Sequence, residues 1–243
     1  MDSGFYAACC GLMARSQALD LAANNLSNTN TSGFKAHRLQ FRGQMAAVSG
    51  VPSDWLTTRL NRFGVMGAAG VDLSGGNLER TDNETDVAIE GPAFFAVQTA
   101  AGVRYTRNGS FHLSTTGTLV TESGDQVLGS DGAISLPSGP ITISGDGTIS
   151  SAGAVAARLQ LVEFPDGTEI ACEGGGYYSA DQGGAAATHS VVRQAMLESS
   201  NVSPVKAAVN LIEVERSFEM LQRTMSIFHS EFNRIATDEI ARV

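Results

Sequence analysis

A run of regularly spaced apolar residues near the C-terminal end constrains the fold most. The spacing alternates between three and four residues through Leu211, Val214, Phe218, Leu221, Met225, Phe228, Phe232 and Ile235. Eight consecutive matches predict a long helix whose apolar seam packs in a coiled coil. Ser203 is the expected N-cap and Pro204 the first helical residue, because proline lacks the N–H that a first turn leaves unpaired. A helix over 204–242 would be about 58 Å long, too long to cover only one compact domain.

Helix-to-helix contact is also expected beyond this seam. Val205, Val209 and Ile212 lie to its side, so more than one partner helix can pack on the first turns. The N-terminal end repeats the seam more weakly, through Phe5, Cys9, Leu12, Ser16, Leu19, Ala23 and Leu26. Small residues at several of these positions allow helices to approach closely. Two amphipathic helices that merely cover a β domain are the alternative. We favour assembly, because nothing in the centre of the chain matches the apolar seam.

An asparagine-rich segment ends the N-terminal helix. Its side chains bond their own backbone and favour turns. The turn residues are Asn24, Asn25, Asn28, Gly33 and Phe34. Gly33 is expected to take a positive φ, which glycine adopts without a steric penalty.

Charge and composition separate the centre from both ends. The chain has 243 residues and a net charge of −9, and residues 46–197 alone carry a net charge of −9. That centre is rich in Gly, Thr, Ser and Val, whereas the ends contain few glycines. We therefore predict an α+β protein with long terminal helices in a coiled-coil domain and a mainly antiparallel β centre. The expected regions are 1–45 (helix and turn), 46–80 (extended connector), 81–197 (β domain) and 198–243 (long helix).

Short strands separated by turn signals are expected in the centre. The candidate strands are 86–89, 93–99, 103–107, 110–114, 118–121, 141–144, 148–150 and 159–163. The pairs between them that favour tight hairpin turns are Asn108-Gly109, Asp131-Gly132, Asp146-Gly147 and Asp166-Gly167.

Catalytic and cofactor motifs are not found. The chain has no phosphate-binding loop, its four histidines lack metal-ligand spacing, and the Asp-Gly pairs lack a calcium-binding period. Asp82, Glu84, Asp86 and Glu90 cluster near one strand, and alternation would place the last three on one face. Paired acids serve glycosidases, but the single Trp55 lies outside this cluster, so catalysis is not expected. No catalytic residue, metal site or cofactor is predicted.

Charge and hydrophobicity argue against nucleic-acid-binding proteins, membrane-spanning proteins and proteins with a secretory signal peptide. A net charge of −9 repels phosphate backbones, so no nucleic-acid partner is expected. No apolar run approaches the roughly 20 residues of a membrane-spanning helix. The N-terminus lacks the basic and apolar regions of a secretory signal peptide, so any export is expected to use another route.

Four segments resemble the flagellar rod, hook and hook-associated axial proteins of bacteria. The N-terminal signature is LAANNLSNTNTSGFK (21–35), and the C-terminal one is LESSNVSPVKAAVNLIEVERSFEMLQRTM (197–225). The β-domain segments are TDVAIEGPAFFAV (85–97) and RYTRNGSF (104–111). The resemblance covers both ends and most of the centre. Short length and the opening MDSGFY resemble the proximal rod branch more than the distal rod branch, which remains an alternative.

The resemblance implies a structural subunit without enzymatic activity, cofactor or small-molecule substrate. Its implied partners are itself, neighbouring rod subunits and the flagellar type III export apparatus. It implies a rod within the periplasm, export without a cleaved signal peptide, and terminal helices that form an inner tube. A secreted β-domain adhesin that trimerises through coiled-coil ends is the alternative from another class. An adhesin would form a closed trimer, whereas a rod subunit would stay monomeric until it meets its template.

Overall fold

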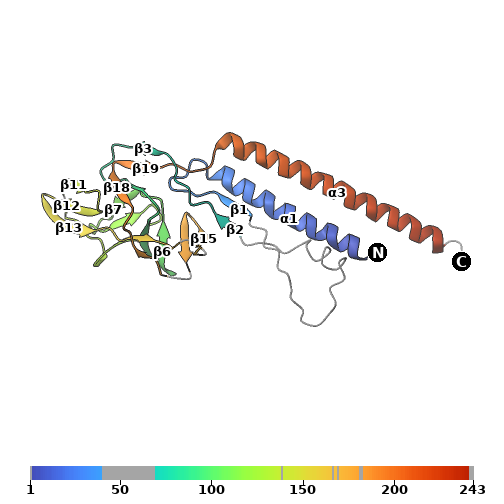
Figure 1. Ribbon diagram of the computed structural model, residues 1–243, viewed down its shortest axis with the longest axis horizontal. Helices are drawn as coiled ribbons and strands as arrows, with labels where there is room; N and C mark the ends of the chain where they lie inside the picture. The colour runs from blue at the N-terminus through green and yellow to red at the C-terminus, as the bar shows by residue number, and fades with distance from the viewer. Residues whose placement is uncertain are drawn as a thin grey trace. The chain divides into compact units, whose positions relative to one another are not determined.

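The computed structural model describes residues 2–39, 69–137, 139–165, 167–168, 170–180 and 183–240. The chain divides into two compact units. The helical unit contains α1 (Asp2–Ser27) up to Leu26 together with α3 (Pro204–Ile240). The second, here called the β unit, comprises Ser27–His37 and Gly70–Ser203. Figure 1 shows the two helices in blue and in orange to red, and the strands of the β unit.

The helices begin and end near the predicted residues. α3 starts at Pro204, as expected, and its 37 residues give a length of about 56 Å. α1 ends at Ser27, so Asn24 and Asn25, which were expected in the turn, lie in the last turn of the helix instead. The two helices and the many antiparallel strands confirm the α+β class. The predicted coiled-coil domain is not shown, because α1 has only 26 residues and one chain does not establish the partner of the seam.

Between the two helices, the described residues form short strands. They are β1 (His37–Leu39), β2 (Ala69–Val71), β3 (Leu78–Arg80), β4 (Val87–Glu90), β5 (Phe94–Thr99), β6 (Gly102–Thr106), β7 (Phe111–Leu113), β8 (Leu119–Thr121), β9 (Gln126–Gly129), β10 (Gly132–Ala133), β11 (Ile141–Ile143), β12 (Thr148–Ser151), β13 (Ala154–Arg158), β14 (Leu161–Glu163), β15 (Ile170–Gly174), β16 (Tyr177–Ala180), β17 (Ala185–Ala186), β18 (Val191–Gln194) and β19 (Met196–Glu198). All eight predicted strands are present, with ends shifted by up to two residues. β2 and β3 fall in the range expected to be an extended connector, of which 46–68 lies outside the described residues.

The largest sheet has the order β15-β16-β6-β5-β9-β8-β7, with β10 beside β9 and with β14, which also pairs with β17, beside β5. β11, β12 and β13 form a three-stranded sheet, and β1 pairs with β2. Two antiparallel pairs join distant segments: β18 with β4, and β19 with β3. Because β19 precedes α3, its pairing with β3 fixes the segment that leads into α3 onto the β unit.

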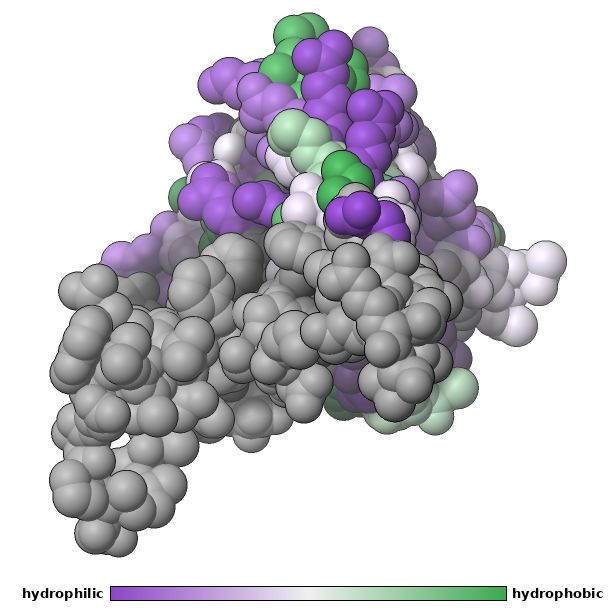
Figure 2. Space-filling view, turned by 90° about the vertical axis from the view of Figure 1, so that its right-hand side faces the viewer, coloured by the Kyte–Doolittle hydropathy of each residue, from purple (hydrophilic) through white to green (hydrophobic). Residues whose placement is uncertain are grey.

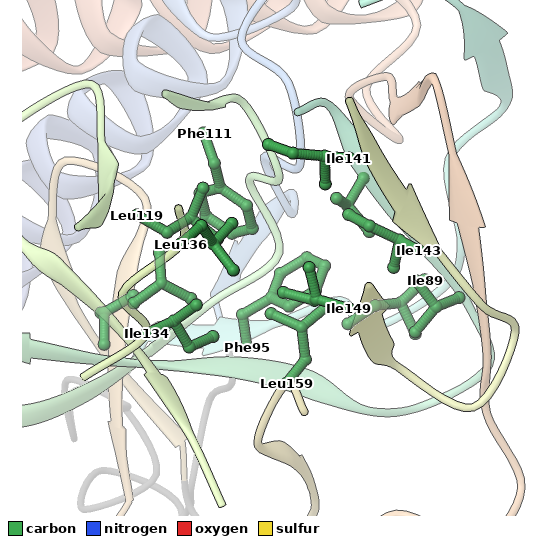
Figure 3. Packing of buried hydrophobic residues seen from close by; sticks show 14 of the residues in the cluster. Ile89, Phe95, Phe111, Leu119, Ile134, Leu136, Ile141, Ile143, Ile149 and Leu159 are labelled. Atoms are coloured by element: carbon green, nitrogen blue, oxygen red, sulfur yellow. The ribbon is translucent and has the colours of Figure 1, made fainter. Parts of the chain in front are cut away.

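Apolar side chains from several strands form the core, as Figure 3 shows. Phe95 of β5 is fully buried there and packs edge-on against Phe111, with ring centroids 5.1 Å apart. Successive residues of a strand point to opposite faces, so Phe94 points away from this core. Phe94 instead packs against Tyr178 of β16, with centroids 5.6 Å apart. β5 is therefore buried on both faces.

Two of the predicted hairpin turns are confirmed and one is wrong. Asp131-Gly132 follows β9 in the hairpin with β10, and Asp146-Gly147 joins β11 to β12. Asn108-Gly109 does not close a hairpin, because β6 pairs with β5 and β16 while β7 pairs with β8. A Cβ at Gly109 would lie 1.6 Å from the Val87 carbonyl oxygen, so close backbone approach requires this glycine. For Asp166-Gly167, the aspartate lies outside the described residues.

Candidate functional site

The turn after α1 begins the candidate site. The Thr31 backbone N–H donates to the Asn28 carbonyl oxygen at 3.3 Å, and its hydroxyl donates to the Asn28 side chain at 3.1 Å. The Phe34 N–H donates to the Thr31 carbonyl at 3.3 Å. Gly33 has a φ of 69°, as the sequence predicts. Successive turns thus lead from Asn28 to Phe34, and the following Lys35 is fully buried in the β unit.

Three buried charges meet at this point. The Lys35 Nζ donates to the Glu198 Oε1 at 2.6 Å, and the Arg107 Nη1 lies 3.4 Å from the Glu198 Oε2. Side-chain exposure is 0% for Lys35 and 2% for each of the other two. Charged groups are rarely fully buried unless they are paired, because burial removes their hydration. One carboxylate therefore bridges two cations, and we call these three residues the charge cluster.

Backbone groups supply further hydrogen bonds to the cluster, although the buried Arg107 Nε has no hydrogen-bond partner. The Lys35 Nζ also donates to the Ser74 carbonyl at 2.8 Å, and the Gly76 N–H donates to the Glu198 Oε1 at 2.8 Å. The Arg107 Nη2 donates to the Gly91 carbonyl at 2.7 Å. The Arg107 guanidinium also lies 4.9 Å from the centroid of the Phe94 ring. A cation over an aromatic face is attracted by the ring quadrupole, so Phe94 stabilises the arginine.

Two glycines allow the segments to approach this closely. The Gly33 N–H donates to the Glu198 backbone carbonyl at 2.6 Å, and a Cβ at Gly33 would lie 2.3 Å from the Arg107 carbonyl carbon. A Cβ at Gly76 would lie 1.9 Å from the Ser199 carbonyl oxygen. Both distances are far inside van der Waals contact. Larger residues at these positions would separate the segments that carry the charges.

Asn201 connects the same segments a second time. Its Oδ1 accepts the Ala36 N–H at 2.8 Å, and its Nδ2 donates to the carbonyls of Asp72 and Ser74 at 2.9 and 3.1 Å. The residues that follow α1 and those that precede α3 are thus joined to each other and to the strand-rich part of the β unit.

The electrostatics of the cluster reflect its burial. Burial lowers the pKa of Lys35, and the hydrogen bond and charge of Glu198 partly oppose this shift. Burial also lowers the pKa of Arg107, again against the attraction of Glu198. The formal charge of the three groups is +1. These residues are sealed from solvent and held by several hydrogen bonds, an arrangement that can fix the geometry of the chain.

The side chains predicted to pack between subunits are half-buried wherever the structure describes those named here. In α3 the half-buried side chains are Leu211, Val214, Phe218, Leu221 and Met225. In α1 the half-buried side chains include Leu12, Leu19 and Leu26. The side chains of Phe5, Phe228, Phe232 and Ile235 lie outside the described residues. Of the predicted turn residues, Asn24 (exposed) and Asn25 (half-buried) lie inside α1, whereas Asn28 (half-buried) and the buried Gly33 and Phe34 follow it.

The acidic residues considered for catalysis have separate structural contacts. Asp82 pairs with Arg80 at 2.5 Å, and Glu90 pairs with Arg193 at 2.9 Å. Glu84 accepts the Ile141 N–H at 3.2 Å. Asp86, which is 6% exposed, accepts a bond from Asn83 at 2.9 Å. The expectation that Glu84, Asp86 and Glu90 share one face is wrong, because Asp86 is buried whereas the other two are exposed.

The described part of the chain has neither a metal-binding cluster nor a membrane-spanning helix. Among those residues, no group of three or more His, Cys, Asp or Glu side chains is arranged to hold a metal ion. Neither described helix combines the length and the apolar character needed to cross a membrane.

Sequence reasoning did not identify the charge cluster. Lys35, Arg107 and Glu198 all stand in segments singled out by resemblance, but no role was assigned to them. A signal was present, because each is a charged residue flanked by turn residues or apolar residues. Glu198 also carries the opposite charge to Lys35 and Arg107. Proximity could not be read from the chain, because 163 positions separate Lys35 from Glu198.

Three family models match the chain, and each contains one member of the charge cluster. "Flagella basal body rod protein" covers residues 5–35 and so includes Lys35. "Flagellar hook protein FlgE/F/G D1 domain" covers 88–155 and includes Arg107. "Flagellar basal body rod FlgEFG protein C-terminal" covers 193–236 and includes Glu198.

Relatives that match nearly the whole chain are also flagellar rod proteins. The flagellar basal-body rod protein FlgF of Caulobacter vibrioides is 32% identical, and the match covers 100% of both chains. FlgF of Salmonella typhimurium is 34% identical over 93% of this chain and 94% of its own. The rod protein FlgG of Buchnera aphidicola is 31% identical over 89% and 92%. The chain therefore belongs to the flagellar basal-body rod protein family, as a FlgF-like structural subunit of the rod.

Proposed function

We propose that this subunit polymerises through its terminal helices and transmits torque along the rod. Its partners are further copies of itself and neighbouring rod subunits. The half-buried seam of α3, from Leu211 to Met225, supports this role because each seam residue still exposes surface that a second helix can cover. Contact with the seam would bury apolar area, which is the main source of association free energy.

The charge cluster supports torque transmission. A load applied to the helices passes into the β unit through the segments that carry Lys35 and Glu198, because these segments lead directly to α1 and α3. Buried ion pairs and hydrogen bonds resist displacement more than solvated loops do. The single observation that carries the proposal is that three segments, one from each family match, meet in one buried cluster.

The remaining parts of the proposal concern location and export. We place the subunit in the proximal rod, within the periplasm, after passage through the flagellar type III apparatus without cleavage of a signal peptide. The FlgF relatives support the proximal position. A distal, FlgG-like position is the second candidate, supported by the 31% identity to FlgG. The adhesin alternative is not retained, since the full-length relatives are rod proteins. We assign the subunit no catalytic role.

A charge placed in the seam tests polymerisation. Phe218→Asp is expected to leave the β unit folded and to abolish rod growth, because an unpaired charge in a packed seam costs several kcal/mol. Gln222→Asp is the matched control, since Gln222 is exposed one turn further along the same helix. The measurement is swimming in soft agar, with near-ultraviolet circular dichroism of the purified variant as the check on folding. Normal swimming of the Phe218 variant would remove the seam from the mechanism.

A further inference from the structure

One residue pair in the β unit keeps a chemical reactivity that the rod function does not use. On the face of the molecule drawn in Figure 2, apolar side chains of the described surface stand directly beside hydrophilic ones, so this face does not by itself define a partner. Asn108, by contrast, is the only asparagine of the sequence that a glycine follows directly. Glycine has no side chain to hinder the attack of its backbone nitrogen on the preceding asparagine side chain. Asn108-Gly109 is therefore the position at which deamidation is expected first.

Deamidation at this pair needs only water as a co-reactant. The Gly109 backbone nitrogen attacks the Asn108 Cγ, the new C–N bond closes a five-membered succinimide ring, and the bond from Cγ to Nδ2 breaks. The proton of the Gly109 N–H passes through solvent to the leaving nitrogen, which departs as ammonia. Water then adds to one of the two ring carbonyls. Opening on one side gives aspartate, and opening on the other gives isoaspartate, in which the main chain runs through the former side chain.

The fold requires this glycine and so preserves the reactive pair. A Cβ at Gly109 would lie 1.6 Å from the Val87 carbonyl oxygen, so a larger residue does not fit. The Val87 N–H also donates to the Gly109 carbonyl oxygen at 3.0 Å. Because Asn108-Gly109 closes no hairpin, it is this close approach of two backbones, not a turn, that demands the glycine.

The closed fold restrains the attack. The Ser110 N–H donates to the Asn108 Oδ1 at 3.0 Å, and the Asn108 N–H donates to the Thr106 hydroxyl at 3.1 Å. For the ring to close, the Asn108 side chain must leave Ser110, and the peptide between Asn108 and Gly109 must rotate. The hydrogen bond from Val87 to the Gly109 carbonyl opposes this rotation. The reaction therefore has to wait for a local opening of the chain.

The charge cluster controls how easily this segment opens. Gly33 packs on its backbone, since a Cβ at Gly33 would lie 2.3 Å from the Arg107 carbonyl carbon and 2.4 Å from the Asn108 nitrogen. The Arg107 side chain is held by Glu198 at 3.4 Å and by the Gly91 carbonyl at 2.7 Å. Asn108 can move away only after these contacts have opened.

We propose that Asn108 is a latent deamidation site, which the closed charge cluster protects and whose isoaspartate product prevents the cluster from closing again. Isoaspartate adds one carbon to the main chain next to Arg107, where Gly33 leaves no room for it. Aspartate keeps the length of the main chain, and its carboxylate can still accept the Ser110 N–H, so this product is tolerated. Chains that stay open for long thus acquire a permanent covalent mark, and this inference does not depend on the rod assignment.

Ageing of the purified full-length chain tests the protection. Wild type, Lys35→Met and Glu198→Gln would be incubated at mildly alkaline pH, in buffer and in urea, and then digested. The peptides with asparagine, aspartate and isoaspartate at position 108 would be separated by chromatography and quantified by mass spectrometry. Glu122→Gln is the matched control, because it removes an exposed carboxylate of the β unit outside the cluster. Near-ultraviolet circular dichroism reports whether each variant is folded at the start.

The wild-type chain should deamidate at Asn108 at least about tenfold more slowly in buffer than in urea, because the reaction waits for opening. The rate in buffer should rise for Lys35→Met and further for Glu198→Gln, whereas Glu122→Gln should match the wild type. If Glu198→Gln is unfolded from the start, the comparison of Lys35→Met with the wild type carries the test. Equal rates in buffer and urea, or cluster variants that react no faster than the wild type, would overturn the protection.

The products test the second part of the proposal. The isoaspartate form, isolated after ageing in urea, should not regain the near-ultraviolet signal when urea is removed, whereas Asn108→Asp should unfold at nearly the wild-type temperature. Asn108→Ser, aged in the same way, controls for changes at other residues and should refold as well after ageing as before. Recovery of the wild-type unfolding transition by the isoaspartate form would overturn the proposed block.

Discussion

Removal of the one carboxylate in the charge cluster is the most informative perturbation. Glu198→Gln keeps the shape of the side chain but changes the formal charge of the cluster from +1 to +2. Lys35 and Arg107 then remain buried, at 0% and 2% exposure, without a counter-ion. Loss of one partner from a buried pair costs about 3–5 kcal/mol. In proteins of 150–250 residues, each kcal/mol lowers Tm by about 2–4 °C, so we expect a fall of roughly 6–20 °C.

Lys35→Met is the matched comparison, because it removes the opposite charge from the same contact. The formal charge of the cluster then falls to zero, and Glu198 keeps both Arg107 and the Gly76 N–H. Methionine fills most of the lysine volume, so the loss of stability should be smaller than for Glu198→Gln. The assay is thermal unfolding of the full chain, followed by near-ultraviolet circular dichroism. An equal or larger effect of Lys35→Met would refute the argument from charge balance.

Three further predictions concern the β unit. Gly33→Ala should destabilise it more than Gly124→Ala, measured by urea unfolding: both have positive φ, but only Gly33 would clash, with the Arg107 backbone. Phe95→Ala should lower the free energy of unfolding by about 3–5 kcal/mol in the same assay, because it empties a fully buried site. The pKa of Glu163 is lowered, since hydrogen bonds from Ser190 and the His189 backbone outweigh its burial. It therefore contributes stability above pH 4.5 that is lost as pH falls below that value, and Glu163→Gln should flatten this part of a pH–stability curve.

The features that the sequence predicted are encoded locally. The seam of α3 follows from a repeat that one helix displays by itself, and Pro204 marks its start. The Asp146-Gly147 hairpin depends on two residues and the strands beside them; Gly147 has a φ of 83°, and the Asp146 carboxylate accepts a bond from the Thr148 hydroxyl at 2.8 Å. Such signals act over a few residues, so they can be recognised without knowledge of the fold.

The features that were missed depend on contacts between distant segments. β19 was not predicted as a strand, because Met196–Glu198 becomes one only by pairing with β3, more than 100 residues away. Asn108-Gly109 has the composition of a hairpin turn, yet its glycine is needed for contact with the Val87 backbone. The charge cluster likewise exists only after the β unit has formed. Local patterns contain no information on which charged residues will be brought together.

The most direct test of the central claim is the location of this chain in the cell. Hook-basal bodies would be purified with detergent, analysed by mass spectrometry, and labelled with an antibody against the β unit. We predict that the chain is present and that the label lies on the rod next to the membrane ring. A label directly below the hook would move the subunit to the distal rod. Absence of the chain from the particles would contradict the account.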